Sequence, residues 1–157
     1  MPEPVIDISI ECKDWEAELP DIESHIRTTA MAVLKAMEIE DQATELSVVL
    51  SNDKFIQVLN KQWRGKDKPT NVLSFPQEEP ELMGDVIMAF ETVKREATEQ
   101  DKDFEDHAKH LIVHGVLHLL GHDHEEDEEA EKMEALEIRI LNALGVKNPY
   151  ESGNFVS

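Results

Sequence analysis

The late part of the chain contains the run His114-Gly115-Val116-Leu117-His118-Leu119-Leu120-Gly121-His122-Asp123-His124. His114 and His118 are four residues apart in an apolar, helix-favouring stretch, so both imidazoles share one helix face with Cβ atoms about 5–6 Å apart. Gly121 supplies the left-handed residue that commonly ends a helix, and the turned chain can bring His124 back to the same point. Three histidines with an open fourth position are typical of a catalytic metal site rather than a closed structural one. The run therefore predicts a helix that carries the ligands of one divalent metal ion.

The same spacing, His-x-x-x-His-x-x-Gly-x-x-His, is that of the metzincin proteases, whose signature places a Glu directly after the first histidine. This chain has Gly115 at that position. The carboxylate that acts as general base in those proteases is therefore absent. The pattern predicts a metal-dependent hydrolase and argues against a peptidase.

Zn²⁺ is the default ion for such a ligand set, although three imidazoles also accept nickel, cobalt, copper or iron. His122 is a rival to His124 as third ligand, and His124 is preferred because its spacing from Gly121 matches a known three-ligand geometry. His110, one turn before His114, is too far along a straight helix to share the ion and is expected to be buried or to support a ligand. His107 is expected to be solvated.

Hydrophobic periodicity gives the fold class. The pattern predicts strands near 4–10, 45–51, 72–75 and 84–90, and helices near 21–37, 53–63, 91–100, 103–120 and 125–144. This order indicates an α+β fold, a small mixed β-sheet of about four strands covered by helices, with the histidines on a late helix and the turn after it. The 157 residues suggest a single domain, 1–157, with a tail that frays from about residue 150.

The composition limits the possible partners and location. The formal net charge is −20, from 35 acidic and 15 basic residues, so the average surface repels nucleic acid. The single cysteine, Cys12, fits a reducing compartment. The chain shows no secretory signal and no apolar run of membrane-spanning length, so we expect a cytoplasmic protein that does not contact a membrane.

A local basic cluster interrupts this acidic background. Four of the eight residues from 61 to 68 are basic: Lys61, Arg64, Lys66 and Lys68. The cluster follows a predicted helix and is a plausible phosphate-binding patch, in which the Arg64 guanidinium suits bidentate phosphate contact. Trp63 could stack on a base, but it continues the apolar face of the helix, so we expect it in the core.

Three segments carry a family resemblance. The segment from Leu59 to Pro76, the tetrapeptide Gly84-Asp85-Val86-Ile87 and the segment from His110 to His124 resemble, in this order, the YbeY family of bacterial ribosomal RNA maturation factors. Two positions depart from the common family pattern: Asn71 stands where Asp is frequent, and His122 where Tyr is frequent.

The resemblance implies a single-strand-specific, metal-dependent endoribonuclease that acts in small-subunit ribosomal RNA 3′-end maturation and in ribosome quality control. Ribosomal RNA and the ribosome or its proteins would then be the partners. His114, His118 and His124 match the family's metal ligands, and Arg64 matches its functional arginine; Lys61, Lys66 and Lys68 are the candidate substrate-binding residues. The alternatives are a ribosome assembly factor with a structural metal and no significant nuclease activity, and a zinc metalloprotease-like hydrolase.

Overall fold

A four-stranded mixed sheet forms the centre of the fold in a computed structural model that describes residues 3–77, 79, 81–122 and 126–150. The strands are β1 (Val5–Ile10), β2 (Glu45–Ser51), β3 (Val72–Pro76) and β4 (Leu82–Ala89). Their order across the sheet is β1-β2-β4-β3. Strands β1, β2 and β4 are parallel, and β3 pairs antiparallel with β4. Strand β3 therefore forms an edge of the sheet.

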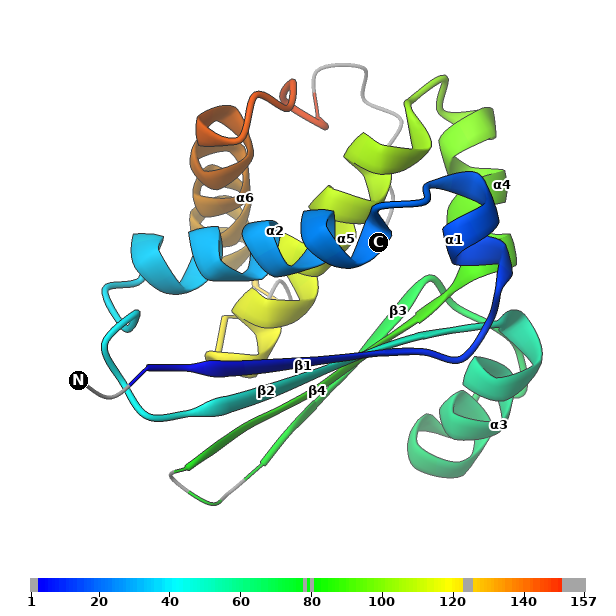
Figure 1. Ribbon diagram of the computed structural model, residues 1–157, viewed down its shortest axis with the longest axis horizontal. Helices are drawn as coiled ribbons and strands as arrows, with labels where there is room; N and C mark the ends of the chain where they lie inside the picture. Colours follow the sequence, from blue (N-terminus) through cyan, green and yellow to red (C-terminus); the bar gives the residue numbers. More distant parts are fainter. Residues whose placement is uncertain (1–2, 78, 80, 123–125, 151–157) are drawn as a thin grey trace.

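The helices lie on both faces of this sheet. They are α1 (Asp14–Glu18), α2 (Ile22–Ala36), α3 (Asp53–Arg64), α4 (Phe90–Glu99), α5 (Phe104–Leu119) and α6 (Asp127–Ala143). Helices α2 and α5 cross one face, and α3 lies on the opposite side (Figure 1). The predicted class, a small mixed sheet covered by helices with the histidines on a late helix, is confirmed.

Alternation along the strands produces two apolar clusters. Leu46, Val48 and Leu50 of β2 belong to the larger cluster, which includes side chains of α2 and α5. Leu73 and Ile87 point to the other face and pack with Ile56 of α3. Because strand side chains alternate between faces, one sheet supports both layers.

Two packing predictions from the periodicity of α3 were wrong. The apolar spacing of residues 53–63 predicts that Phe55 and Trp63 face inward, but they are 46% and 65% exposed. The buried positions of α3 are Ile56 and Asn60. Because only the narrow face with Ile56 and Asn60 is buried, the apolar residues on either side of it remain at the surface.

Short helix α1 was not predicted, because five residues are too few to show helical periodicity. Its Trp15 is fully buried and donates from Nε1 to the carbonyl of Ser51 at 2.9 Å. The expected tail beyond residue 150 lies outside the described residues. Within the described residues, no helix is long and apolar enough to cross a membrane.

Candidate active site

Helix α5 places the two predicted ligands that the structure describes. The helix packs on β3 and β4, and most of its residues are buried. Gly115 permits this packing: a Cβ there would lie 2.9 Å from Val86 Cγ1. The hydroxyl of Ser74 also donates to the Gly115 carbonyl at 2.9 Å. Side chains of the sheet therefore occupy the space that the general base of the proteases would need at position 115.

His114 and His118 point toward one another from successive turns of α5. Their Nε2 atoms are 3.0 Å apart. Nitrogen ligands of a tetrahedral zinc ion with bonds of about 2.0–2.1 Å lie roughly 3.3 Å apart. The two imidazoles therefore converge closely enough to bind one ion.

A buried carboxylate from α6 supports His114. Glu137 Oε1 lies 2.9 Å from His114 Nδ1 and 3.2 Å from His110 Nε2. Burial by itself would raise the pKa of Glu137, but the hydrogen bonds and charges of the two histidines outweigh burial and lower that pKa to about 2. Because an ionised carboxylate only accepts hydrogen bonds, His114 donates from Nδ1 to Glu137, and Nε2 is the ring nitrogen that faces His118.

The histidine pair opens into a cleft of about 870 Å³ between α5, α4 and the segment from Asn60 to Pro76. Its lining includes four basic side chains, those of Arg64, Lys66, Lys68 and Arg95. Glu96 is the single acidic residue among the described residues that line it. In a chain with a net charge of −20, this concentration of positive charge favours an anionic ligand.

The basic loop has a defined local structure. The Asn52 side chain accepts from the backbone N–H of Phe55 and caps α3. Gly65 ends the helix in the left-handed region, with φ of 69°. Asn60 then holds the returning loop, because its Nδ2 donates to the carbonyl of Lys68 at 2.9 Å. Arg64 donates a long hydrogen bond, 3.5 Å, to the carbonyl of Ser74.

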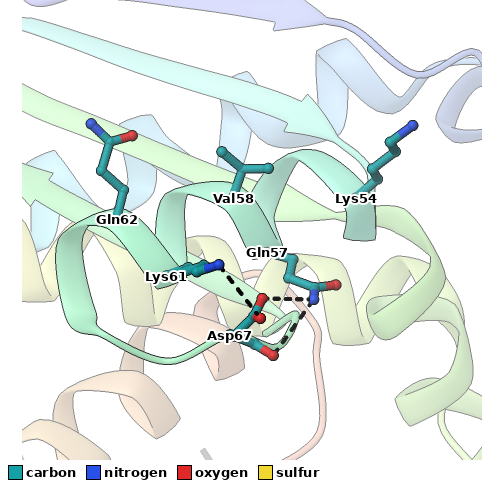
Figure 2. Close-up of a pocket in the computed structure, with 6 residues that line it drawn as sticks. All are labelled: Lys54, Gln57, Val58, Lys61, Gln62 and Asp67. Carbon is teal, nitrogen blue, oxygen red and sulfur yellow. Dashed lines mark hydrogen bonds and ion pairs between the residues drawn. The ribbon is translucent and has the colours of Figure 1, made fainter.

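Lys61 lies apart from the other three members of the basic cluster. It lines a separate shallow depression on α3, with Lys54, Gln57, Val58, Gln62 and Asp67 (Figure 2). Its ammonium group is 3.8 Å from the Asp67 carboxylate, which also accepts from Gln57 Nε2 at 3.0 Å. The structure brings Arg64, Lys66 and Lys68 to the histidines and places Lys61 elsewhere.

Glu96 anchors the wall of the cleft that α4 provides. Its carboxylate accepts from Asn71 Nδ2 at 3.0 Å and lies 2.9 Å from His107 Nε2. The expectation that His107 is solvated was wrong, because this histidine is fully buried. Asn71, directly before β3, offers Glu96 a neutral hydrogen-bond donor. An Asp at this position would place a second carboxylate beside Glu96.

The third predicted ligand, His124, lies outside the described residues, as does Asp123. His122 lines the cleft. Within residues 3–77, 79, 81–122 and 126–150, no group of three or more His, Cys, Asp or Glu side chains is arranged to hold a metal ion. The described part of the site is thus the His114–His118 pair.

Sequence reasoning missed three residues of the site: Glu137, Glu96 and Arg95. For Glu137 a signal existed, because it occupies the apolar stripe of α6 with Met133, Ile140 and Leu141. A carboxylate in such a stripe requires buried partners. Glu96 and Arg95 lie on a polar helix face, and only the tertiary structure brings them to the cleft.

An α+β fold in which converging imidazoles line a strongly basic cleft is typical of a hydrolase acting on an anionic substrate. A family model described as "Endoribonuclease YbeY" matches residues 7–145. The chain belongs to the YbeY family of endoribonucleases, which are hydrolases acting on RNA.

Individual relatives agree with this assignment. The chain is similar to two proteins named "Endoribonuclease YbeY". The one from Paramagnetospirillum magneticum is 49% identical, and the match covers 92% of this chain and 94% of that protein. The one from Sinorhizobium fredii is 48% identical, and the match covers 92% of this chain and 91% of that protein. The Bradyrhizobium sp. protein of that name is 45% identical and covers 95% and 94%. The solution structure of the Thermotoga maritima protein TM1509 is similar with a TM-score of 0.61 and 29% identity, covering 90% of this chain and 92% of that one.

Proposed function

We propose that this protein is a cytoplasmic, metal-dependent endoribonuclease that cuts single-stranded RNA in ribosomal RNA processing. Maturation of the small-subunit RNA 3′ end and quality control of ribosomes are the proposed roles, with the ribosome or its proteins as partners. The observation that carries the proposal is the single cleft that contains His114, His118 and the cations Arg64, Lys66 and Lys68.

The residues present fit a divalent ion. His114 Nε2 and His118 Nε2 converge at 3.0 Å, and the hydrogen bond from His114 Nδ1 to Glu137 leaves Nε2 as the nitrogen directed at His118. We propose His124 as the third ligand and Zn²⁺ as the ion, on the chemistry of an all-imidazole donor set. When bound, such an ion supplies Lewis-acid polarisation of a phosphoryl oxygen or acidifies a water molecule.

The surrounding side chains have separate roles in this proposal. Arg64 binds the scissile phosphate with paired N–H groups and stabilises the charge that develops on it. Lys66 and Lys68 bind neighbouring phosphates and set the register of the strand. We propose a single strand as the substrate, because its flexible backbone can follow the line of cations in this cleft.

The packing of α5 argues against peptide hydrolysis. A metzincin-like enzyme needs a carboxylate at position 115, and even a Cβ there would lie only 2.9 Å from Val86 Cγ1, which leaves too little space for a glutamate. A basic cleft also suits a phosphodiester better than a neutral peptide backbone. The site therefore favours RNA over protein as substrate.

The test is cleavage of a short labelled single-stranded RNA by stringently purified protein. Matched samples contain a chelator, the His118→Ala variant or the Arg64→Ala variant, and the Lys61→Ala variant serves as a control for loss of a cation outside the cleft. We expect defined internal cuts by wild type and by Lys61→Ala, and loss of these cuts in the other three samples. Cuts that persist in His118→Ala and in Arg64→Ala would contradict the proposal.

Absence of cleavage by the folded, zinc-loaded wild-type protein on both free RNA and pre-ribosomal particles would favour an assembly factor. In that case Arg64→Ala is expected to reduce ribosome association, which sucrose-gradient sedimentation measures. Lost processing with intact association supports the catalytic role of Arg64 instead.

A further inference from the structure

Glu137 is a buried carboxylate in an otherwise apolar helix stripe. It is 1% exposed and lies between Met133, Ile140 and Leu141 on the inner face of α6. A charge in such a position is costly unless it is paired and hydrogen-bonded. Buried ion pairs are frequently no more stabilising than apolar residues of similar size. Stability alone therefore gives no reason for a glutamate at this position.

Both carboxylate oxygens of Glu137 are used. Oε1 accepts from His114 Nδ1 at 2.9 Å and from His110 Nε2 at 3.2 Å. Oε2 accepts from the hydroxyl of Tyr150 at 2.6 Å. Three donors from α5 and from the segment after α6 thus fix the carboxylate in one orientation.

This orientation determines what His114 presents to the cleft. The proton held at Nδ1 excludes the other tautomer, and the ring plane is fixed so that Nε2 lies 3.0 Å from His118 Nε2. We infer that Glu137 is a positioning residue that orients His114 as a metal ligand and raises its basicity, with Tyr150 and His110 holding the carboxylate in place. The inference rests on the proposed metal site.

The network also gives a role to the segment after α6. Tyr150 is seven residues beyond the end of α6 at Ala143, and its hydroxyl reaches the same carboxylate that supports His114. Tyr150 is therefore connected to the proposed metal ligand through two hydrogen bonds, Tyr150 to Glu137 and His114 to Glu137. Removing the Tyr150 hydroxyl weakens the positioning of Glu137 without changing any charge.

The first measurement is zinc affinity, determined by competition with a chromophoric chelator on metal-free protein. The Glu137→Gln variant keeps the shape and removes the charge, and Glu131→Gln removes a carboxylate from the exposed face of the same helix as a control. We expect Glu137→Gln to bind zinc about 10–100-fold more weakly, Tyr150→Phe several-fold more weakly, and Glu131→Gln within two-fold of wild type.

The second measurement uses the zinc-loaded wild-type protein labelled with ¹⁵N-histidine. Long-range ¹H–¹⁵N correlations are expected to show His114 bound to zinc through Nε2 with a proton on Nδ1. Coordination through Nδ1 would overturn the inference without reference to any variant.

The outcomes separate this inference from the proposed function. Unchanged zinc affinity in Glu137→Gln and Tyr150→Phe, with only a lower melting temperature, makes Glu137 a structural residue and leaves the metal site intact. Failure of wild type to bind zinc, nickel, cobalt, copper or iron overturns the metal site itself, and the inference with it.

Discussion

The hydroxyl of Ser74 donates a hydrogen bond of 2.9 Å to the backbone carbonyl of Gly115, which joins the edge strand β3 to the helix that carries the histidines. On the same side, a Cβ at position 115 would lie 2.9 Å from Val86 Cγ1 and 3.3 Å from Ser74 Oγ. The glycine thus allows α5 to approach the sheet closely. It also explains in steric terms why this ligand pattern occurs without the glutamate of the metzincins.

Replacing Gly115 by alanine is expected to destabilise the protein. Alanine gains up to about 1 kcal/mol in helix propensity, but the methyl group forces the buried, β-branched Val86 to move, which costs about 1–3 kcal/mol. We expect the free energy of unfolding in urea to fall by about 1 kcal/mol, and Gly115→Glu to give no folded protein. A Gly115→Ala variant more stable than wild type would show that the close contact between α5 and β4 does not exclude a methyl group at this position.

Gly84→Ala is expected to be more damaging than Gly115→Ala. Gly84 has φ of 140°, and a Cβ there would lie 2.4 Å from the backbone oxygen of Phe75 on the neighbouring strand. Unlike a valine methyl group, a backbone carbonyl in a paired strand cannot rotate away. We expect a loss of more than about 3 kcal/mol, measured by urea unfolding beside the Gly115→Ala protein. Equal stability of the two variants would contradict this order.

The lysines of the basic cluster are expected to differ in their effect on RNA binding. Lys66 and Lys68 line the cleft, whereas Lys61 lies outside it beside Asp67. Binding of a labelled single-stranded RNA is measured by fluorescence anisotropy at several salt concentrations, in the His118→Ala background to prevent cleavage. Lys66→Ala and Lys68→Ala should each reduce the slope of log binding constant against log salt concentration by about 0.7. Lys61→Ala should leave that slope unchanged. An equal effect of all three would place the RNA across α3 as well.

The regular elements were predictable because local patterns determine them. Alternation in β1 and β2 and the apolar spacing of α2 and α5 each recur over enough residues to give a period. The edge position of β3 and its antiparallel pairing with β4 were not predictable, because both depend on contacts between segments distant in the sequence. The same holds for Trp15, whose short helix has no periodicity of its own.

The site was predictable where its residues are close in sequence. His114 and His118 share a helix face by spacing alone, and Arg64 with Lys66 and Lys68 lies in one short basic segment. Glu96 and Arg95 reach the cleft from α4, and Glu137 reaches His114 across 23 residues of sequence. The misplacement of Trp63 has a physical cause: the end of α3 buries Asn60, whose side chain donates to the Lys68 carbonyl of the returning loop, and leaves the indole at the surface.

Exposed Trp63 is expected to matter for RNA binding rather than for stability. Its indole is 65% exposed, packs against the Phe75 ring at 6.3 Å between centroids, and adjoins Arg64 in sequence. Stacking of a base on an aromatic side chain contributes about 1–3 kcal/mol. Trp63→Ala should therefore weaken single-stranded RNA binding by at least about five-fold, with a urea midpoint close to that of wild type. A matched Trp63→Phe variant should retain most of the affinity. If Trp63→Ala lowers the urea midpoint but not the affinity for RNA, Trp63 contributes to packing and not to RNA binding.

Zinc is expected to stabilise the folded protein through the His114–His118 pair. A ligand that binds only the folded state at 100 times its dissociation constant adds about 2.7 kcal/mol. For a protein of this size each kcal/mol raises the melting temperature by roughly 2–4 °C. Metal-free protein should therefore melt about 5–10 °C higher when zinc is restored, measured by differential scanning calorimetry. His118→Ala should lose this shift, because His114 is then the one proposed ligand left on α5, whereas His25→Ala on α2 should keep it. A shift of equal size in His118→Ala would show that zinc binds at another position.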